Sequence, residues 1–189
     1  MHVLCNRSTS SQLCAHMNAA VLSTTTGGAA APHAGPAISV LMCARNAELF
    51  LRAAVSSILQ QTERDFELIC VDDGSTDGTL RILQEYAQQD TRVRLLLQPH
   101  QRGVAASLVA GLAMARAPLV ARMDADDVSL PERLQLQRHY MDAHSDIDVL
   151  VTAVEAFGTS AAARTIALPT GAALVAWSLR SSAHWRTPL

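Results

Sequence analysis

The sequence predicts an α/β fold in which a mainly parallel sheet is flanked by helices, and three observations support this prediction. Short apolar runs alternate with segments of helical periodicity, the pattern of strands joined by right-handed crossovers. Hydrophobic residues make up 49% of the chain and charged residues 17%, so a buried core is expected. Acidic clusters directly follow two of the apolar runs, at the strand ends where such sheets bind ligands.

A buried strand and an amphipathic helix begin the predicted domain. Residues 38–43 form a short apolar run that is typical of a buried strand. Asn46 is a suitable N-cap for a helix over residues 47–60. The apolar residues of this helix recur at helical spacing and comprise Leu51, Val55 and Ile58, with Phe50, Ala54 and Leu59 beside them.

Two further strand–helix units follow. Residues 66–71 predict a second strand, and Ser75 or Thr76 would cap the helix after it. Residues 93–97 predict a third strand, and Gly103 begins an Ala-rich helix. The inward-facing residues of these two helices are expected to be Leu80, Leu83 and Ala87 in the first, and Ala105, Leu108, Val109 and Leu112 in the second.

The last predicted helix lies between two strands, residues 119–123 and 147–154. It covers residues 131–143, and Ser129 and Glu132 match a capping box at its start. These elements complete the alternating pattern on which the α/β prediction rests.

The length of the chain favours one domain preceded by a tail. At roughly 100 to 200 residues per domain, 189 residues leave little spare length. Residues 1–36 are rich in Ser, Thr, Ala and Gly and lack a sustained period, so we expect a disordered, low-complexity tail. Residues 37–189 would form the folded domain.

Charge, hydropathy and cysteine spacing exclude several classes. Fifteen basic and seventeen acidic residues give a net charge of -2, and the absence of a basic run argues against nucleic-acid binding. No apolar stretch reaches the roughly 18 residues of a membrane span, and we expect no secretory signal. Without CxxC or paired His/Cys spacing, cysteines such as Cys43 and Cys70 should be reduced and structural, which suits the cytoplasm.

Both acidic clusters lie where predicted strands end. Asp72 and Asp73 follow the second strand, and Asp124 and Asp126 follow the fourth. Because parallel strands end at one edge of a sheet, these carboxylates would repel one another unless a positive group lay there. Carboxylate oxygens suit Mg²⁺ or Mn²⁺, which complete their shells with water and substrate phosphates. The pattern therefore implies a ligand that carries a diphosphate.

Each acidic motif is also compatible with a different role. The DDGSTDG segment, residues 72–78, is what a strand-to-helix turn with a helix cap requires. A calcium loop would place Gln84 at its twelfth position and would follow a helix rather than a strand, so we reject it. We also reject a phosphoacceptor of the receiver-domain type, because the chain has no lysine. A D-x-D pattern occurs by chance in many proteins, and here only its context supports it.

Four segments carry a family resemblance: SVLMCARN (39–46), VDDGSTDGT (71–79), RGVAAS (102–107) and DADDVSLPERL (124–134). In this order they resemble the family 2 glycosyltransferases with the GT-A, Rossmann-like fold, over residues 37 to about 155. The resemblance implies transfer of a sugar from a nucleoside diphosphate sugar, here a UDP-sugar, to a hydroxyl acceptor. It also implies inversion and dependence on a divalent metal.

The resemblance implies roles for the acids. Asp73 would accept an N–H of the base, Asp124 would lie near the ribose, and Asp126 would hold the Mg²⁺ or Mn²⁺ that bridges the phosphates. Asp126 and Asp124 are the expected metal ligands. The expected nucleotide-sugar-binding residues are Cys43, Ala44, Arg45, Asp72, Asp73, Gly103 and Asp124.

Two departures from the family pattern limit these expectations. Residues 42–45 stand where family members often have a Pro and an aromatic residue, so stacking on the base would be altered or lost, although the planar guanidinium of Arg45 could still stack. No Glu-Asp segment after residue 155 supplies a general base, and His184 is the remaining candidate for a role there. The chain is therefore expected to hold a donor-binding half, incomplete at its C-terminal side.

Two functions remain open from the sequence: sugar transfer, or a catalytically silent nucleotide-sugar-binding fragment that lacks the general base. A nucleotidyltransferase is disfavoured, because the first strand-to-helix turn, residues 45–48, has no glycine. The resemblance implies a saccharide or lipid-linked acceptor and a role in cell-surface polysaccharide synthesis at the cytoplasmic face of the membrane, with peripheral association. Missing strands would leave an uncovered sheet edge, which favours a homo-oligomer.

Overall fold

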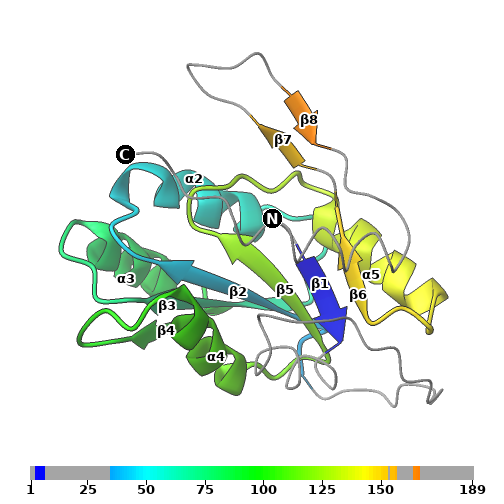
Figure 1. Ribbon diagram of the computed structural model, residues 1–189, viewed down its shortest axis with the longest axis horizontal. Coiled ribbons are helices and arrows are strands. Elements are labelled where there is room, and N and C mark those ends of the chain that lie inside the picture. The colour runs from blue at the N-terminus through cyan, green and yellow to red at the C-terminus, as the bar shows by residue number, and fades with distance from the viewer. Residues whose placement is uncertain (1–2, 7–34, 153, 157–163, 167–189) are drawn as a thin grey trace.

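The computed structural model describes residues 3–6, 35–152, 154–156 and 164–166 (Figure 1). They form a six-stranded sheet in the order β4-β3-β2-β5-β1-β6 and a separate two-stranded sheet, β7-β8. The elements are β1 (Val3–Asn6), β2 (Ile38–Ala44), α2 (Glu48–Leu59), β3 (Phe66–Asp72), α3 (Thr79–Gln89), β4 (Val93–Leu97), α4 (Val104–Met114), β5 (Leu119–Asp124), α5 (Arg133–Ala143), β6 (Val149–Val151), β7 (Val154–Ala156) and β8 (Arg164–Ile166).

Four neighbouring strands, β4, β3, β2 and β5, are parallel to one another. Each is followed by a helix or follows one, so the chain builds successive strand–helix–strand units with helices on both faces of the sheet (Figure 1). Strand β1 pairs antiparallel with both β5 and β6. The described residues therefore confirm the predicted α/β fold with a mainly parallel sheet.

Two apolar clusters hold the layers together. The larger lies between the sheet and α2, α3 and α5, and includes Val40 and Met42 of β2. The smaller lies against α4 and includes Leu41 of β2 and Leu108 of the helix. Because successive strand residues point to opposite faces, one buried strand serves both clusters. All seven residues of β3 are buried, which explains its nearly unbroken apolar sequence.

Strand β1 corrects the expectation of a tail over residues 1–36. Val3–Asn6 lies between β5 and β6, and Leu4 is fully buried. The composition of the surrounding segment concealed a strand of only four residues, and for these residues the prediction of disorder was wrong. Residues 7–34 lie outside the described part of the chain.

The predicted helix caps were wrong. Asn46 has a φ of 50° and lies outside α2, whose N-cap is Ala47. Its side-chain oxygen instead accepts hydrogen bonds from the N–H (2.9 Å) and the hydroxyl (3.3 Å) of Thr76, which join the turns after β2 and β3. Helix α3 begins at Thr79, after Gly78, without a side-chain cap.

The capping box predicted at residues 129–132 does not form. Helix α5 begins at Arg133, and its N-cap Glu132 makes no side-chain cap bond. The Ser129 hydroxyl accepts hydrogen bonds from Gln61 Nε2 at 3.2 Å and from an Arg133 guanidinium nitrogen at 3.4 Å. Tertiary partners have therefore replaced the local cap.

The predicted inward residues are mostly correct for α2 and only partly correct for α4. Leu51, Ala54, Val55 and Ile58 of α2 are buried, whereas Phe50 is largely exposed. In α4, Leu108 is buried as expected, but Val109 is 45% exposed. Ser107 and Gly111 are also buried on that helix. The helix packs closely on the sheet at Gly111, where a Cβ would lie 2.9 Å from a methyl group of Val71.

The apolar run at residues 147–154 contains two strands rather than one. β6 pairs with β1 in the large sheet, whereas β7 pairs antiparallel with β8. Figure 1 shows β7 and β8 projecting beyond the larger sheet.

Candidate functional site

The two acidic segments meet at the end of β2. In the parallel ladders, Ala44 pairs with Asp72 of β3, and Cys43 pairs with Asp124 of β5. The N–H of Asp73 donates to the carbonyl oxygen of Ala44 at 2.9 Å. The structure therefore places both acidic segments on either side of one strand, at the carboxyl edge where α/β sheets bind ligands.

The acids divide between the two faces of the sheet. Asp73 contacts the loop that leads into α4, and Asp72 lines a pocket with Leu80 of α3. Successive residues of an extended chain point to opposite faces, which accounts for the different surroundings of these two neighbouring side chains. Among the expected site residues, the structure therefore does not bring the side chain of Asp72 to that of Asp73.

Asp73 fixes the loop before α4. It is 1% exposed, and its two carboxylate oxygens accept hydrogen bonds from the N–H groups of Arg102 (2.7 Å) and Gly103 (2.9 Å). Burial opposes ionisation, but these bonds, a hydrogen bond with Ser107 and the nearby charge of Arg45 hold the pKa of Asp73 below its usual value. Gly103 has a φ of 89°, in the region that favours glycine. The sequence did not reveal this anchoring role.

Cys43 lies among the groups of the α4 face. It is half-buried, and burial raises the pKa of its thiol, opposed by a hydrogen bond with Ser107. The charges of Asp73 and Asp124 raise this pKa further, while Arg122 lowers it. Carboxylates from both acidic segments thus affect the pKa of one thiol, which supports the expectation that Asp73 and Asp124 share a face.

Asp124 is paired with an arginine of its own strand. Arg122 donates from Nε at 3.1 Å and from Nη2 at 2.7 Å to one Asp124 oxygen. Burial disfavours the charged form, but positive charge, including that of Arg122, lowers the pKa of Asp124. Asp126 is exposed in the turn that follows, and the N–H of Asp127 donates to the Asp124 carbonyl at 3.3 Å.

Asp124 and Asp126 supply the carboxylate oxygens that a divalent cation prefers, but they do not form a complete coordination site by themselves. Within the described residues, no three His, Cys, Asp or Glu side chains converge as a metal site would require. Mg²⁺ commonly uses only one or two carboxylates and takes its other ligands from phosphates and water. The exposed carboxylate of Asp126 and the paired one of Asp124 suit such an open arrangement.

The other expected residues differ in accessibility. Ala44 is 1% exposed and belongs to the apolar core, and its carbonyl oxygen accepts the N–H of Asp73. Arg45 is exposed, and its charge lowers the pKa of Asp73. His184 lies outside the described residues.

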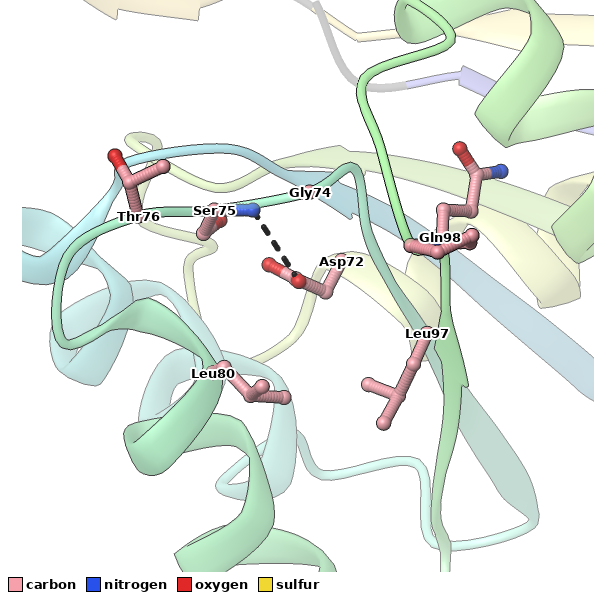
Figure 2. A pocket seen from close by; sticks show the side chains of 8 residues that line it. Asp72, Gly74, Ser75, Thr76, Leu80, Leu97 and Gln98 are labelled. Carbon is pink, nitrogen blue, oxygen red and sulfur yellow. Dashed lines mark hydrogen bonds between the residues drawn. The ribbon is translucent and has the colours of Figure 1, made fainter.

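Asp72 lies in a cavity of about 440 Å³ on the α3 side of the sheet. Figure 2 shows Asp72 between Leu80 and Leu97, with its carboxylate directed towards the backbone of Ser75, whose N–H donates to Oδ2 at 3.3 Å. The buried Oδ1 atom has no hydrogen-bond partner. The lining residues are Asp72, Gly74, Ser75, Thr76, Leu80, Leu97, Gln98 and Pro99.

Arg133 is a buried cation behind the second acidic segment, which sequence reasoning missed. It is 6% exposed, and its Nη2 donates to the carbonyl oxygen of Arg122 at 3.0 Å. Burial lowers the pKa of Arg133 to about 10, opposed by the charges of Asp127 and Asp124. Its place in the PERL segment after the acids was the available signal, but the sequence does not show burial.

None of the helices within the described residues combines the length and apolar character that a membrane span requires.

Known proteins resemble this chain over its folded part. The Bacillus subtilis protein EpsE, assigned as a glycosyltransferase, is 39% identical over 126 residues, covering 66% of this chain and 45% of EpsE. The glycosyltransferase GlyG of Streptococcus pneumoniae is 33% identical over 114 residues, covering 60% of this chain and 38% of GlyG. The chain therefore spans less than half the length of these relatives.

A solved structure has the same fold. S. aureus TarS superposes with a TM-score of 0.54 and 26% identity, covering 57% of this chain and 33% of the TarS chain. TarS has been solved with UDP and with UDP-GlcNAc.

The family description that matches is "Glycosyl transferase family 2", over residues 39–173. This span includes all four segments on which the resemblance rests, and it covers well over half of the chain. The fold, the strand-end acids and this match agree: the chain belongs to glycosyl transferase family 2.

Proposed function

We propose that this chain forms the donor-binding part of a glycosyltransferase that uses a nucleoside diphosphate sugar, most simply a UDP-sugar. The observation that carries the proposal is the meeting of Asp73 and Asp124 on either side of the end of β2, next to the exposed Asp126. TarS, which shares the fold and has been solved with UDP-GlcNAc, supports the choice of donor.

In this proposal the residues of the α4 face divide the work of binding. Asp73 holds the loop at Arg102 and Gly103 and keeps its charge beside Arg45, so that these groups receive the nucleoside. Asp124 and Asp126 would hold Mg²⁺ or Mn²⁺. When bound, the metal would offset negative charge on the departing nucleoside diphosphate.

The whole enzyme would transfer the sugar with inversion to a hydroxyl of a saccharide or lipid-linked acceptor, at the cytoplasmic face of the membrane. The chain spans less than half the length of these relatives, and a fragment that binds the donor without catalysing transfer is the alternative. It predicts affinity for the donor without release or transfer of the sugar.

Calorimetric titration of UDP, UDP-GlcNAc and GDP into the chain, with Mn²⁺, with Mg²⁺ and with EDTA, tests the proposal. We expect UDP binding that the metal strengthens, and Asp126→Ala should weaken it more than about tenfold in Mn²⁺ only. Asp146→Ala, which removes an exposed acid beyond α5, is the matched control and should bind as the parent does. Metal-independent or undetectable binding of every nucleotide would contradict the proposal, and donor hydrolysis separates the enzyme from the silent fragment.

A further inference from the structure

A charged guanidinium is buried directly behind the acidic segment of residues 124–127. Arg133, the first residue of α5, is 6% exposed. Removing a charge from water costs several kcal/mol unless it is well compensated, and an apolar side chain of similar volume avoids that cost. A buried arginine at this place therefore calls for a reason beyond packing.

The contacts of Arg133 bracket the acidic segment. Nη2 donates to the carbonyl oxygen of Arg122, two residues before Asp124. Nη1 lies 3.4 Å from the hydroxyl oxygen of Ser129, two residues after the segment ends. Nε donates to Gln137 Oε1 at 3.2 Å, which fixes the guanidinium to the next turn of the helix. One planar group thus ties together the two ends of the turn that carries the acids.

The C-terminal end of the turn has a second attachment. Gln61, which is fully buried, donates from Nε2 to the Leu130 carbonyl at 2.7 Å and to Ser129 Oγ at 3.2 Å. Its Oε1 accepts the N–H of Leu134 at 3.0 Å. Gln61 lies just after α2, and the N–H of Ser129 donates to the hydroxyl of Ser57 within α2 at 3.0 Å. The turn is therefore held between α2 and α5, while Asp126 remains exposed.

The charge of Arg133 also matters to the acids. Asp127 and Asp124 are close enough for their charges to stabilise the guanidinium. The interaction is reciprocal, so the buried cation offsets part of the repulsion between carboxylates in the segment. Removing this charge would increase the repulsion between the carboxylates of the segment before any ligand binds.

We propose that Arg133 is a positioning residue for the metal and diphosphate: it holds the turn of residues 124–127 so that Asp124 and Asp126 can share one divalent cation. This inference rests on the proposed function. Arg133 itself lies behind the turn and does not touch the ligand. Loss of supporting groups around metal ligands commonly weakens metal affinity about 10- to 100-fold.

The test measures UDP affinity with Mn²⁺ and with EDTA for Arg133→Met and Arg133→Lys. We expect Arg133→Met to lose about 10- to 100-fold of affinity in Mn²⁺ and less than about twofold in EDTA. Arg133→Lys keeps the charge but not the planar fork, and should recover roughly threefold of the loss. Arg138→Met is the control, because Arg138 lies on the same helix but binds Glu63 at 2.9 Å and should leave both affinities unchanged.

Three outcomes would overturn the inference. If Mn²⁺ strengthens UDP binding by Arg133→Met as much as by the parent, the inference is wrong while the proposed function stands. If the variant loses UDP affinity equally with Mn²⁺ and with EDTA, the role of Arg133 is merely structural. If Arg133→Met does not fold by circular dichroism, Ser129→Ala and Arg133→Lys carry the same comparison. A parent chain without metal-dependent UDP binding would instead overturn the proposed function, and this inference with it.

Discussion

Replacing Asp73 with asparagine removes the charge that holds the loop before α4 while keeping the shape of the side chain. The two Asp73 oxygens accept the N–H groups of Arg102 and Gly103 at 2.7 and 2.9 Å. Asparagine has one acceptor oxygen and one NH₂ group, so one backbone N–H would face another donor. The side chain is 1% exposed, so water cannot readily replace the lost acceptor.

The expected cost combines a lost charge-assisted bond with an unsatisfied buried donor. Together these should lower the free energy of unfolding by about 2–4 kcal/mol. Urea denaturation followed by circular dichroism measures the change, and hydrogen exchange should show faster exchange at the amides of Arg102 and Gly103. Asp126→Asn removes an exposed acid from the same edge and should change stability by less than about 0.5 kcal/mol.

If Asp73→Asn unfolded like the parent, within about 0.5 kcal/mol, and kept the protection of both amides, Asp73 would not be the anchor of this loop. If Asp126→Asn destabilised the chain equally, the effect would come from net charge at the edge rather than from the two hydrogen bonds.

Three other predictions concern stability. Burial opposes ionisation of Glu67 and Asp73, but hydrogen bonds and nearby arginines outweigh it and hold their pKa values below the ordinary 4.5 and 3.8. The two carboxylates therefore stabilise the fold above pH 4.5 and 3.8, respectively, and this stabilisation should be lost as the pH falls through their lowered pKa values. Acid titration monitored by circular dichroism measures the loss. Leu4→Ala should cost about 2–5 kcal/mol in urea denaturation, since Leu4 is fully buried, and a near-zero change would place β1 outside the stable sheet. Gly74→Ala should cost about 1–3 kcal/mol, because a Cβ at φ 68° would lie 2.8 Å from the backbone of residues 100 and 101. Gly103→Ala should also destabilise the chain, although its Cβ would meet open space, because φ 89° with ψ 156° is a conformation that essentially only glycine adopts.

The sequence was sufficient for the parallel strands and for the meeting of the acids. Apolar runs such as residues 38–43 and 66–71 are buried strands because both faces of the sheet are covered, which leaves a nearly continuous hydrophobic signal. Once these strands are parallel, their following acids must share an edge, so the places of Asp73 and Asp124 followed from topology. The placement of Asp72 on the other face follows from the alternation of side chains along a strand.

The remaining features depended on tertiary contacts. Asn46 and Ser129 have the residue types of helix caps, but their oxygens bond across the fold to Thr76 and Gln61. Short polar side chains can bond either to the local backbone or to distant groups, and the sequence does not show which distant groups lie within reach. The burial of Arg133 is likewise a consequence of the packing of α5 and not of its own residue type.

The place of β1 imposes an order on the assembly of the domain. The Cys5 thiol reaches the carbonyl oxygen of Val120 across 115 positions of sequence, and within the described residues β6 pairs in the large sheet only with β1. During synthesis β1 leaves the ribosome before the strand it pairs with, so it must wait in an unpaired state until β5 exists. Contacts this distant form late because the intervening chain must first be closed. The edge that ends in β6 should accordingly be the last part of the sheet to acquire protection during refolding.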